Sequence, residues 1–227
     1  MTERDTRPAG EGSADSGAES VAPSTTYSRT GDDGSTALGD QSRTGKADLR
    51  IVAYGEYEEA GAAIGMVIAL GAGLSDEVIT MLARLQNDLV DVGADLCAPL
   101  EGQPTPALRI DTGYVERLER ACDHFDADLP ALPAFVVPGG TATAAMLHRA
   151  RAVVRRAERA TQEAHQHHGE HMNSVIGGYL NRLASLLFIL ARGANAEHGD
   201  TLWQPGLSAQ LGETELWEMP VPEPVET

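Results

Sequence analysis

Apolar residues recur at helical spacing over most of the chain between residues 49 and 193. One stripe advances by three and four positions through Val78, Leu82, Leu85, Leu89, Val92 and Leu96, and another through Ile176, Leu180, Leu183, Leu187 and Leu190. This spacing predicts packed helices, the first starting at Ser75 and the second ending near Gly193. Similar patterns predict three more helices over about 49–72, 112–128 and 141–168. With no convincing strand, the pattern indicates an all-α, five-helix antiparallel bundle.

The two ends of the chain lack such stripes. We expect residues 1–26 to be a disordered acidic tail, 27–204 a helical domain, and 205–227 an acidic Pro-rich tail in which Trp217 could dock. No run approaches eighteen uninterrupted apolar residues, so no membrane span is expected. Cys97 and Cys122 fall within helical patterns without metal-ligand spacing and are interpreted as inert core residues. With no targeting signal, the sequence predicts a cytoplasmic protein.

The net charge of the chain limits the kinds of molecule that it can bind. The formal net charge is −17, of which the two tails carry −3 and −5. An acidic chain is a poor ligand for nucleic acid or an anionic membrane, so any anion must bind at a local basic cluster. Five arginines fall between residues 149 and 159, and Arg151, Arg155, Glu158 and Arg159 share one helical face. They predict either a solvated face with internal ion pairs or an anion site.

Residues 27–46, rich in Ser, Thr, Gly and Asp, precede the first helix. Such a segment is either a flexible linker or a source of backbone N–H groups that bind polyphosphate. In the second case it would act together with the guanidinium groups of the arginines at 149–159. Seven pieces, in order, carry a resemblance: "RTGDDGSTALGD", "SRTGK", "AYG", "AAIG", "FVVPGGT", "RAVVRRAER" and "YLNRLASLLFILAR". They resemble the PduO-type ATP:cob(I)alamin adenosyltransferases over about residues 27–206.

The resemblance implies a ferritin-like five-helix bundle assembled as a homotrimer, with active sites between neighbouring subunits. It implies that the 5′-deoxyadenosyl group of ATP, bound with Mg²⁺, moves to cob(I)alamin, giving adenosylcobalamin and triphosphate. A cobalamin-dependent mutase is the implied receiver of the product.

The resemblance also implies roles for residues. ATP would be wrapped by Thr30, Gly31, Asp32, Gly34, Ser35 and Thr36, with Arg43 and Lys46 neutralising phosphate charge. Arg155 would stabilise the departing triphosphate, while Glu158 and Asn181 would position the nucleotide. Phe135 would cover the lower face of the corrin. From the residues alone, Asn181 could equally make a helix-terminal contact and Phe135 could be an ordinary core side chain.

Three departures from the family pattern keep a second function open, that of a non-catalytic cobalamin- or ATP-binding carrier or sensor. Glu58 stands where the family has an Asp that pairs with the equivalent of Arg151, and Gly61 replaces an Asn. Ala184 and Ser185 replace a Ser–Asp pair, which removes a carboxylate.

The remaining candidate is "AHQHHGEH", in which His165, His168 and His171 could meet around a metal. We interpret it instead as a solvated helix end, and His124 and His148 as ordinary surface or partly buried residues.

Overall fold

The computed structural model describes residues 27, 29–100 and 108–210. The tail predicted at 1–26 and Trp217 lie outside the described residues. Along the chain the elements are β1 (Ser35–Ala37), β2 (Arg43–Gly45), α1 (Leu49–Leu70), α2 (Asp76–Leu96), α3 (Thr112–Asp126), α4 (Ala142–His168), the 3-10 turn η1 (Gly169–His171), α5 (Val175–Ala194) and α6 (Leu207–Gln210). All five predicted helices are confirmed, each with its ends within two residues of the prediction. The last, predicted from Ile176 to near Gly193, spans Val175–Ala194.

Side-chain caps begin most of these helices. Ser75 Oγ accepts a hydrogen bond from Val78 N at the start of α2, and Thr141 Oγ1 accepts one from Ala144 N at the start of α4. Asp111 caps α3 in the same manner. These bonds satisfy backbone donors that have no partner inside the helix.

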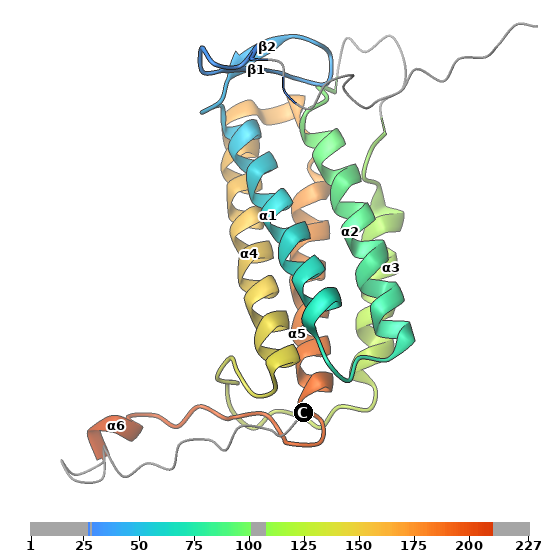
Figure 1. Cartoon of the computed structure of the whole chain (residues 1–227), viewed down its shortest axis with the longest axis vertical. Helices are drawn as coiled ribbons and strands as arrows, with labels where there is room; N and C mark the ends of the chain where they lie inside the picture. The colour runs from blue at the N-terminus through green and yellow to red at the C-terminus, as the bar shows by residue number, and fades with distance from the viewer. Residues whose placement is uncertain (1–26, 28, 101–107, 211–227) are drawn as a thin grey trace, which may run out of the picture.

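The long helices pack side by side in the order α2, α1, α4, α5, α3 (Figure 1). Successive helices run in opposite directions, but α3 and α5 are neighbours that run the same way. Both begin near Asp95, which is hydrogen-bonded to Ile110 and Asn173, and both end near the contact between Arg192 and the Pro130 carbonyl. The predicted antiparallel bundle is therefore confirmed, with one parallel contact.

A single apolar core fills the space between the helices. Its largest fully buried side chains include Leu82, Leu85 and Leu89 of α2 and Leu180, Leu183 and Leu187 of α5. These are the stripes that predicted the two helices. By length and composition α5 is apolar enough to cross a membrane, but here it packs between α3 and α4 in the core.

Buried polar groups hold neighbouring segments together at each end of the bundle. Asp95 is buried, and it accepts hydrogen bonds from Arg109 Nη1 (2.7 Å), Ile110 N (2.8 Å) and Asn173 Nδ2 (2.6 Å). At the opposite end Arg192 contacts Asp126 and Asp200. Because each buried charge has a charged partner, the cost of its desolvation is offset.

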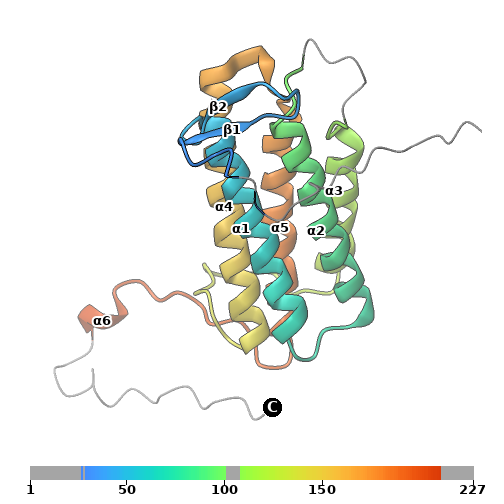
Figure 2. The same cartoon turned by 45° about the horizontal axis from the view of Figure 1, so that its top comes forward.

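The prediction of no strand is wrong for the segment ahead of α1. Strands β1 and β2 pair antiparallel, with Thr36 opposite Thr44. Each strand has three residues and no alternating apolar pattern, so the periodicity gave no signal. Leu38, in the connecting turn, is buried, and Gly39 N donates to Cys97 O at the end of α2 (2.8 Å). The segment is therefore not a flexible linker but a hairpin attached to the bundle (Figure 2).

The two cysteines are partly buried, in agreement with their interpretation as inert. Burial raises the pKa of each thiol to about 11, so both are protonated at neutral pH.

His148 carries a prediction about acid stability. Its side chain is buried on α4, and neither ring nitrogen has a hydrogen-bond partner among the described residues. Desolvation, followed by the charge of Arg151, lowers its pKa. A base with a lowered folded-state pKa contributes stability that is present above its unfolded pKa and is lost as the pH falls. The free energy of unfolding should therefore fall less between pH 7.5 and pH 5.5 in His148→Leu than in wild type.

Urea unfolding at several pH values measures this effect. His168 also has a lowered pKa, so the dependence on pH should become shallower without disappearing. His124→Leu is the control, because His124 is exposed and pairs with Glu77 on the surface. The same pH dependence in His148→Leu and wild type would contradict the prediction.

Candidate functional site

The β1–β2 hairpin gathers most of the predicted ATP-binding residues. Gly34 has a φ of 84°, which favours glycine, and its carbonyl accepts a hydrogen bond from Lys46 N (2.9 Å). A Cβ at Gly31 would lie 2.9 Å from Ser35 O and 3.2 Å from Lys46 Nζ. Any side chain at Gly31 would therefore displace the lysine. Asp32 and Lys46 are exposed, while Thr36 is partly buried in β1.

The two basic residues of the hairpin differ in their surroundings. Arg43 braces the hairpin from within, donating to Thr30 O (2.6 Å) and to Ser35 Oγ, and lying 3.7 Å from Asp33. Asp33, which the sequence reasoning missed, also accepts hydrogen bonds from Ser35 N and Oγ. Lys46 forms no ion pair within the described residues. Of the two, Lys46 is the cation that a phosphate can reach without displacing a partner.

A second group of predicted residues lines a cavity of about 350 Å³ between α4 and α5. Arg151 lies over the ring of Phe188, 5.3 Å from its centroid, and Arg155 is exposed one helical turn further on. Burial, and then the charge of Arg155, lowers the pKa of Arg151. Asp126 also lines this cavity but pairs with Arg192, and Ser185 adds no charge to the wall beside Arg151 and Arg155. The cavity therefore has the electrostatics of an anion site.

Arg155 also borders the next cavity along the same groove, of about 420 Å³. Glu158 and Asn181 meet here, with Asn181 Nδ2 donating to Glu158 Oε1 (2.9 Å). Arg182 donates to Asn181 Oδ1 (2.7 Å) and to Glu119 (2.9 Å). Asn181 is thus held inside α5 by a network that spans three helices, and it is not a helix-terminal contact. The predicted shared face of Arg151, Arg155, Glu158 and Arg159 is confirmed, since all four line these two cavities.

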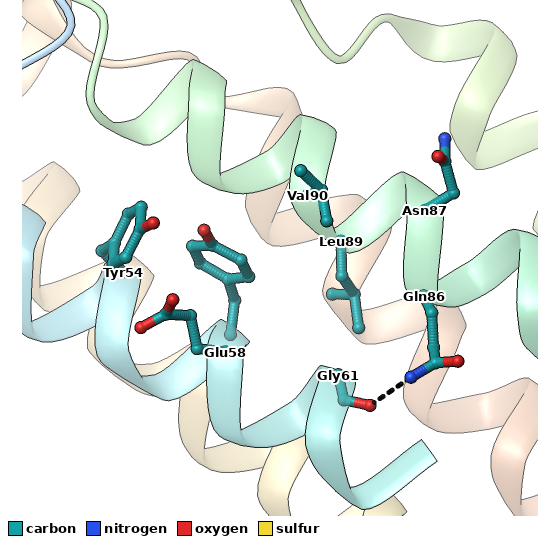
Figure 3. A pocket seen from close by; sticks show the side chains of 8 residues that line it. Tyr54, Glu58, Gly61, Gln86, Asn87, Leu89 and Val90 are labelled. Carbon is teal, nitrogen blue, oxygen red and sulfur yellow. Dashed lines mark hydrogen bonds between the residues drawn. The ribbon is translucent and has the colours of Figure 1, made fainter. Parts of the chain in front are cut away.

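Glu58 lies on a different surface. It lines a cavity of about 540 Å³ between α1 and α2, beside Tyr54 and Tyr57 (Figure 3). Gly61 lies on the same wall, and its carbonyl accepts a hydrogen bond from Gln86 Nε2 (2.9 Å). Neither Glu58 nor Arg151 forms an ion pair within the described part of one chain. The expected Glu58–Arg151 pair therefore does not form inside a single subunit.

Phe135 is not an ordinary core residue. Its side chain is 79% exposed, in the loop that leads into α4. An antiparallel bridge between Val136 and Leu202 brings it beside Trp203, with ring centroids 6.0 Å apart. Trp203 is itself 49% exposed, so the pair forms an aromatic surface. The sequence reasoning missed Trp203, because it lies far from Phe135 along the chain.

The histidine cluster does not form a metal site. Within the described ranges, no group of three His, Cys, Asp or Glu side chains could hold a metal ion. The interpretation as a solvated helix end is wrong for His168, whose side chain is 18% exposed and whose Nε2 lies 3.1 Å from Asp48 Oδ1. That contact joins the end of α4 to the start of α1.

Comparisons with known proteins agree on one family. The family model described as cobalamin adenosyltransferase matches residues 26–194. A corrinoid adenosyltransferase of Mycobacterium tuberculosis is 51% identical over 181 residues, covering 79% of this chain and 93% of that protein. One from Bacillus subtilis is 34% identical over 175 residues, covering 76% and 88%.

The solved structures include a variant PduO-type ATP:corrinoid adenosyltransferase from Lactobacillus reuteri, complexed with cobalamin and ATP. It superposes with a TM-score of 0.74 at 29% identity, covering 80% of this chain and 97% of that one. The matched region contains the hairpin, the arginine face of α4 and the exposed phenylalanine. On this agreement of sequence and fold, the chain belongs to the cobalamin adenosyltransferase family.

Proposed function

We propose that the protein transfers the 5′-deoxyadenosyl group of ATP to cob(I)alamin, in sites formed between the subunits of a homotrimer. The observation that carries this proposal is the row of groups along α4. The exposed Phe135 precedes the helix, and Arg151, Arg155 and Glu158 follow one another along a single face. Arg151 and Glu158 are seven residues apart, or roughly 10 Å along the helix axis.

The order of these groups along α4 matches the order in which the corrin and the nucleotide would bind. A corrin seated against Phe135 and Trp203 would place its upper face toward Arg151. A nucleotide further along would meet Arg155 with its phosphates, and the Glu158–Asn181 pair with its ribose or base. The relative from L. reuteri is complexed with both compounds, which supports the same pair of substrates here.

The positions of Glu58 and Arg151 support a site shared between subunits. Glu58 faces an open cavity on α1 and α2, while Arg151 faces another on α4 and α5. We propose that the first surface of one subunit packs against the second surface of its neighbour. Such a head-to-tail contact closes into a ring when the rotation is threefold. In that ring Glu58 of one subunit would meet Arg151 of the next.

The reaction is a displacement at C5′ of the ribose. The electron pair of Co(I) forms the Co–C bond, and the C5′–O bond breaks with its electrons leaving on the triphosphate. Negative charge therefore grows on the leaving group, where Arg155 and Lys46 can stabilise it electrostatically. The reaction needs no proton transfer, so no general base is assigned.

We assign no protein site to Mg²⁺. The described residues gather no set of three acidic, histidine or cysteine ligands, so the ion would be carried by the phosphates of ATP. We further propose that the protein acts in the cytoplasm and delivers its product to a cobalamin-dependent mutase.

A complementation assay tests the proposal. Wild type with ATP, Mg²⁺ and chemically reduced cobalamin should give the spectrum of adenosylcobalamin, which a carrier or sensor would not produce. Glu58→Ala and Arg151→Ala should each lose most of this activity, since each leaves its partner charge unpaired. When the two variants are co-refolded in equal amounts, each mixed trimer regains one site. About a quarter of wild-type activity should then return.

The matched control mixes Arg151→Ala with Arg155→Ala. These residues share one face of the same helix, so no mixed trimer has an intact site and activity should stay low. No recovery in the Glu58–Arg151 mixture would refute the shared site. An inactive wild type that still binds both compounds would favour the carrier.

A further inference from the structure

Asp48 lies at the junction between the hairpin and the bundle. It follows β2 by three residues and caps α1, with Oδ1 accepting from Arg50 N (2.9 Å) and Nε (3.1 Å). Its other oxygen accepts from Arg50 Nη2 (2.9 Å) and from Thr44 Oγ1 (2.8 Å). Thr44 belongs to β2 and lies two residues before Lys46. One carboxylate therefore holds both a hairpin strand and the first turn of α1.

His168 adds a third element to this carboxylate. It is the last residue of α4, and its Nε2 lies 3.1 Å from Asp48 Oδ1. Only 18% of the His168 side chain and 12% of the Asp48 side chain are exposed. Hydrogen bonds from Arg50 hold the pKa of the Asp48 carboxyl well below its usual range, and burial, then Arg50, lowers the pKa of His168. A neutral imidazole thus donates its Nε2 hydrogen to a carboxylate.

The hairpin is attached to the bundle at two places, and they differ in kind. The turn contacts the end of α2, through buried Leu38 and the bond from Gly39 N to Cys97 O. The strand that leads to Lys46 contacts α1 and α4 through Thr44, Asp48 and His168. Only the second attachment lies beside the lysine. It is also the one that connects to α4, the helix carrying Arg155 and Glu158.

We propose that His168, acting through Asp48 and Thr44, is a positioning residue that holds the hairpin where Lys46 meets the phosphates of ATP. This inference rests on the proposed function, because it assumes that the hairpin binds ATP. His168 touches neither substrate in this scheme. Its loss should therefore weaken ATP binding while leaving the chemical step of bound ATP largely intact.

The test compares His168→Ala with His167→Ala, a matched control whose exposed ring lies beside that of His168. Because a hydrogen bond to a charged group is lost, the Kd and KM for ATP should rise about tenfold in His168→Ala. We expect kcat to stay within about twofold, since Arg155 is unaffected and, once ATP has bound, its phosphates hold Lys46 in place in the variant too. His168→Gln, whose amide can donate to Asp48, should recover much of the affinity.

Thr44→Val gives a second route to the same measurement, since it removes one hydroxyl and leaves the end of α4 unchanged. It should also raise the Kd for ATP. The double variant His168→Ala/Thr44→Val should lose less ATP-binding free energy than the sum of the losses in the two single variants, because both side chains act through the Asp48 carboxylate. Amide hydrogen exchange at Ser35–Gly45, measured without nucleotide, should be faster in both variants than in wild type.

The outcomes separate this inference from the proposed function. Calorimetry measures the Kd for ATP without the transferase reaction, so an inactive wild type refutes the proposed function and leaves this comparison valid. Equal Kd values for His168→Ala and His167→Ala would overturn the inference. A fall in kcat with an unchanged KM would overturn it too, because it would place His168 in the chemical step.

Discussion

Replacing Arg155 with alanine is expected to lower kcat/KM for ATP by about two to three orders of magnitude. Arg155 borders both cavities of the α4–α5 groove, and its exposed guanidinium forms no ion pair with any described carboxylate. Its charge is therefore available to a phosphate and need not be released from a partner. Because negative charge grows on the triphosphate during the reaction, the loss should be larger in kcat/KM than in the affinity for ATP.

Steady-state kinetics and calorimetry with ATP measure the two effects. Arg149→Ala is the matched control, since Arg149 is also an exposed arginine of α4 but pairs with Glu59 of α1 at 3.3 Å. An exposed pair of this kind contributes at most about 1 kcal/mol of stability, so the control should keep near wild-type kinetics. If both variants lost activity equally, the effect would belong to the general charge of α4 and not to Arg155.

Gly93→Ala is expected to cost about 3 kcal/mol of unfolding free energy. Gly93 is buried on α2 against α1, where an added Cβ would lie 1.9 Å from Tyr57 Oη and 2.0 Å from Tyr57 Cζ. The ring of Tyr57 is buried and packs edge-on against Tyr54 at 4.7 Å, so it could avoid the new Cβ only by turning into the adjacent cavity and losing these contacts. The two helices would have to separate, or the tyrosine would have to leave the core.

The control is Gly193→Ala, at an exposed position near the end of α5 where an added Cβ meets nothing within 4 Å. Alanine reduces the entropy of the unfolded chain, so this variant should gain up to about 1 kcal/mol. Urea unfolding of both variants gives the comparison. Unchanged stability in Gly93→Ala would mean that the contact between α1 and α2 is looser than the structure shows.

How much the sequence could predict depended on the range of the interactions involved. The five helices follow from spacings of three and four residues, which reflect local geometry. The common face of Arg151, Arg155 and Glu158 follows from the same rule. The hairpin had no such signal, because its strands are too short for a repeating apolar pattern and are braced by hydrogen bonds such as those that Ser35 donates to Asp33.

The parts that were missed are those in which distant segments meet. His168 and Asp48 are separated by 120 positions, and Trp203 meets Phe135 only through the bridge after α5. Residue type could not reveal either contact. The roles expected of Glu58, Phe135 and Asn181 came from the family resemblance. The structure adds that Glu58 and Arg151 lie on separate surfaces of one chain, which no pattern along the sequence indicated.

The order of the helices in the bundle also affects how the protein is made. Helix α1 packs against α2 and α4, and its contact with α4 joins residues as far apart as Glu56 and Arg156, 100 positions along the chain. As the chain leaves the ribosome, α1 and α2 can pair early, but the face of α1 that will meet α4 has no partner. Until α4 has been synthesised, that face is free for non-native association. Folding of this bundle is thus a late event in synthesis, completed when α4 and α5 become available together.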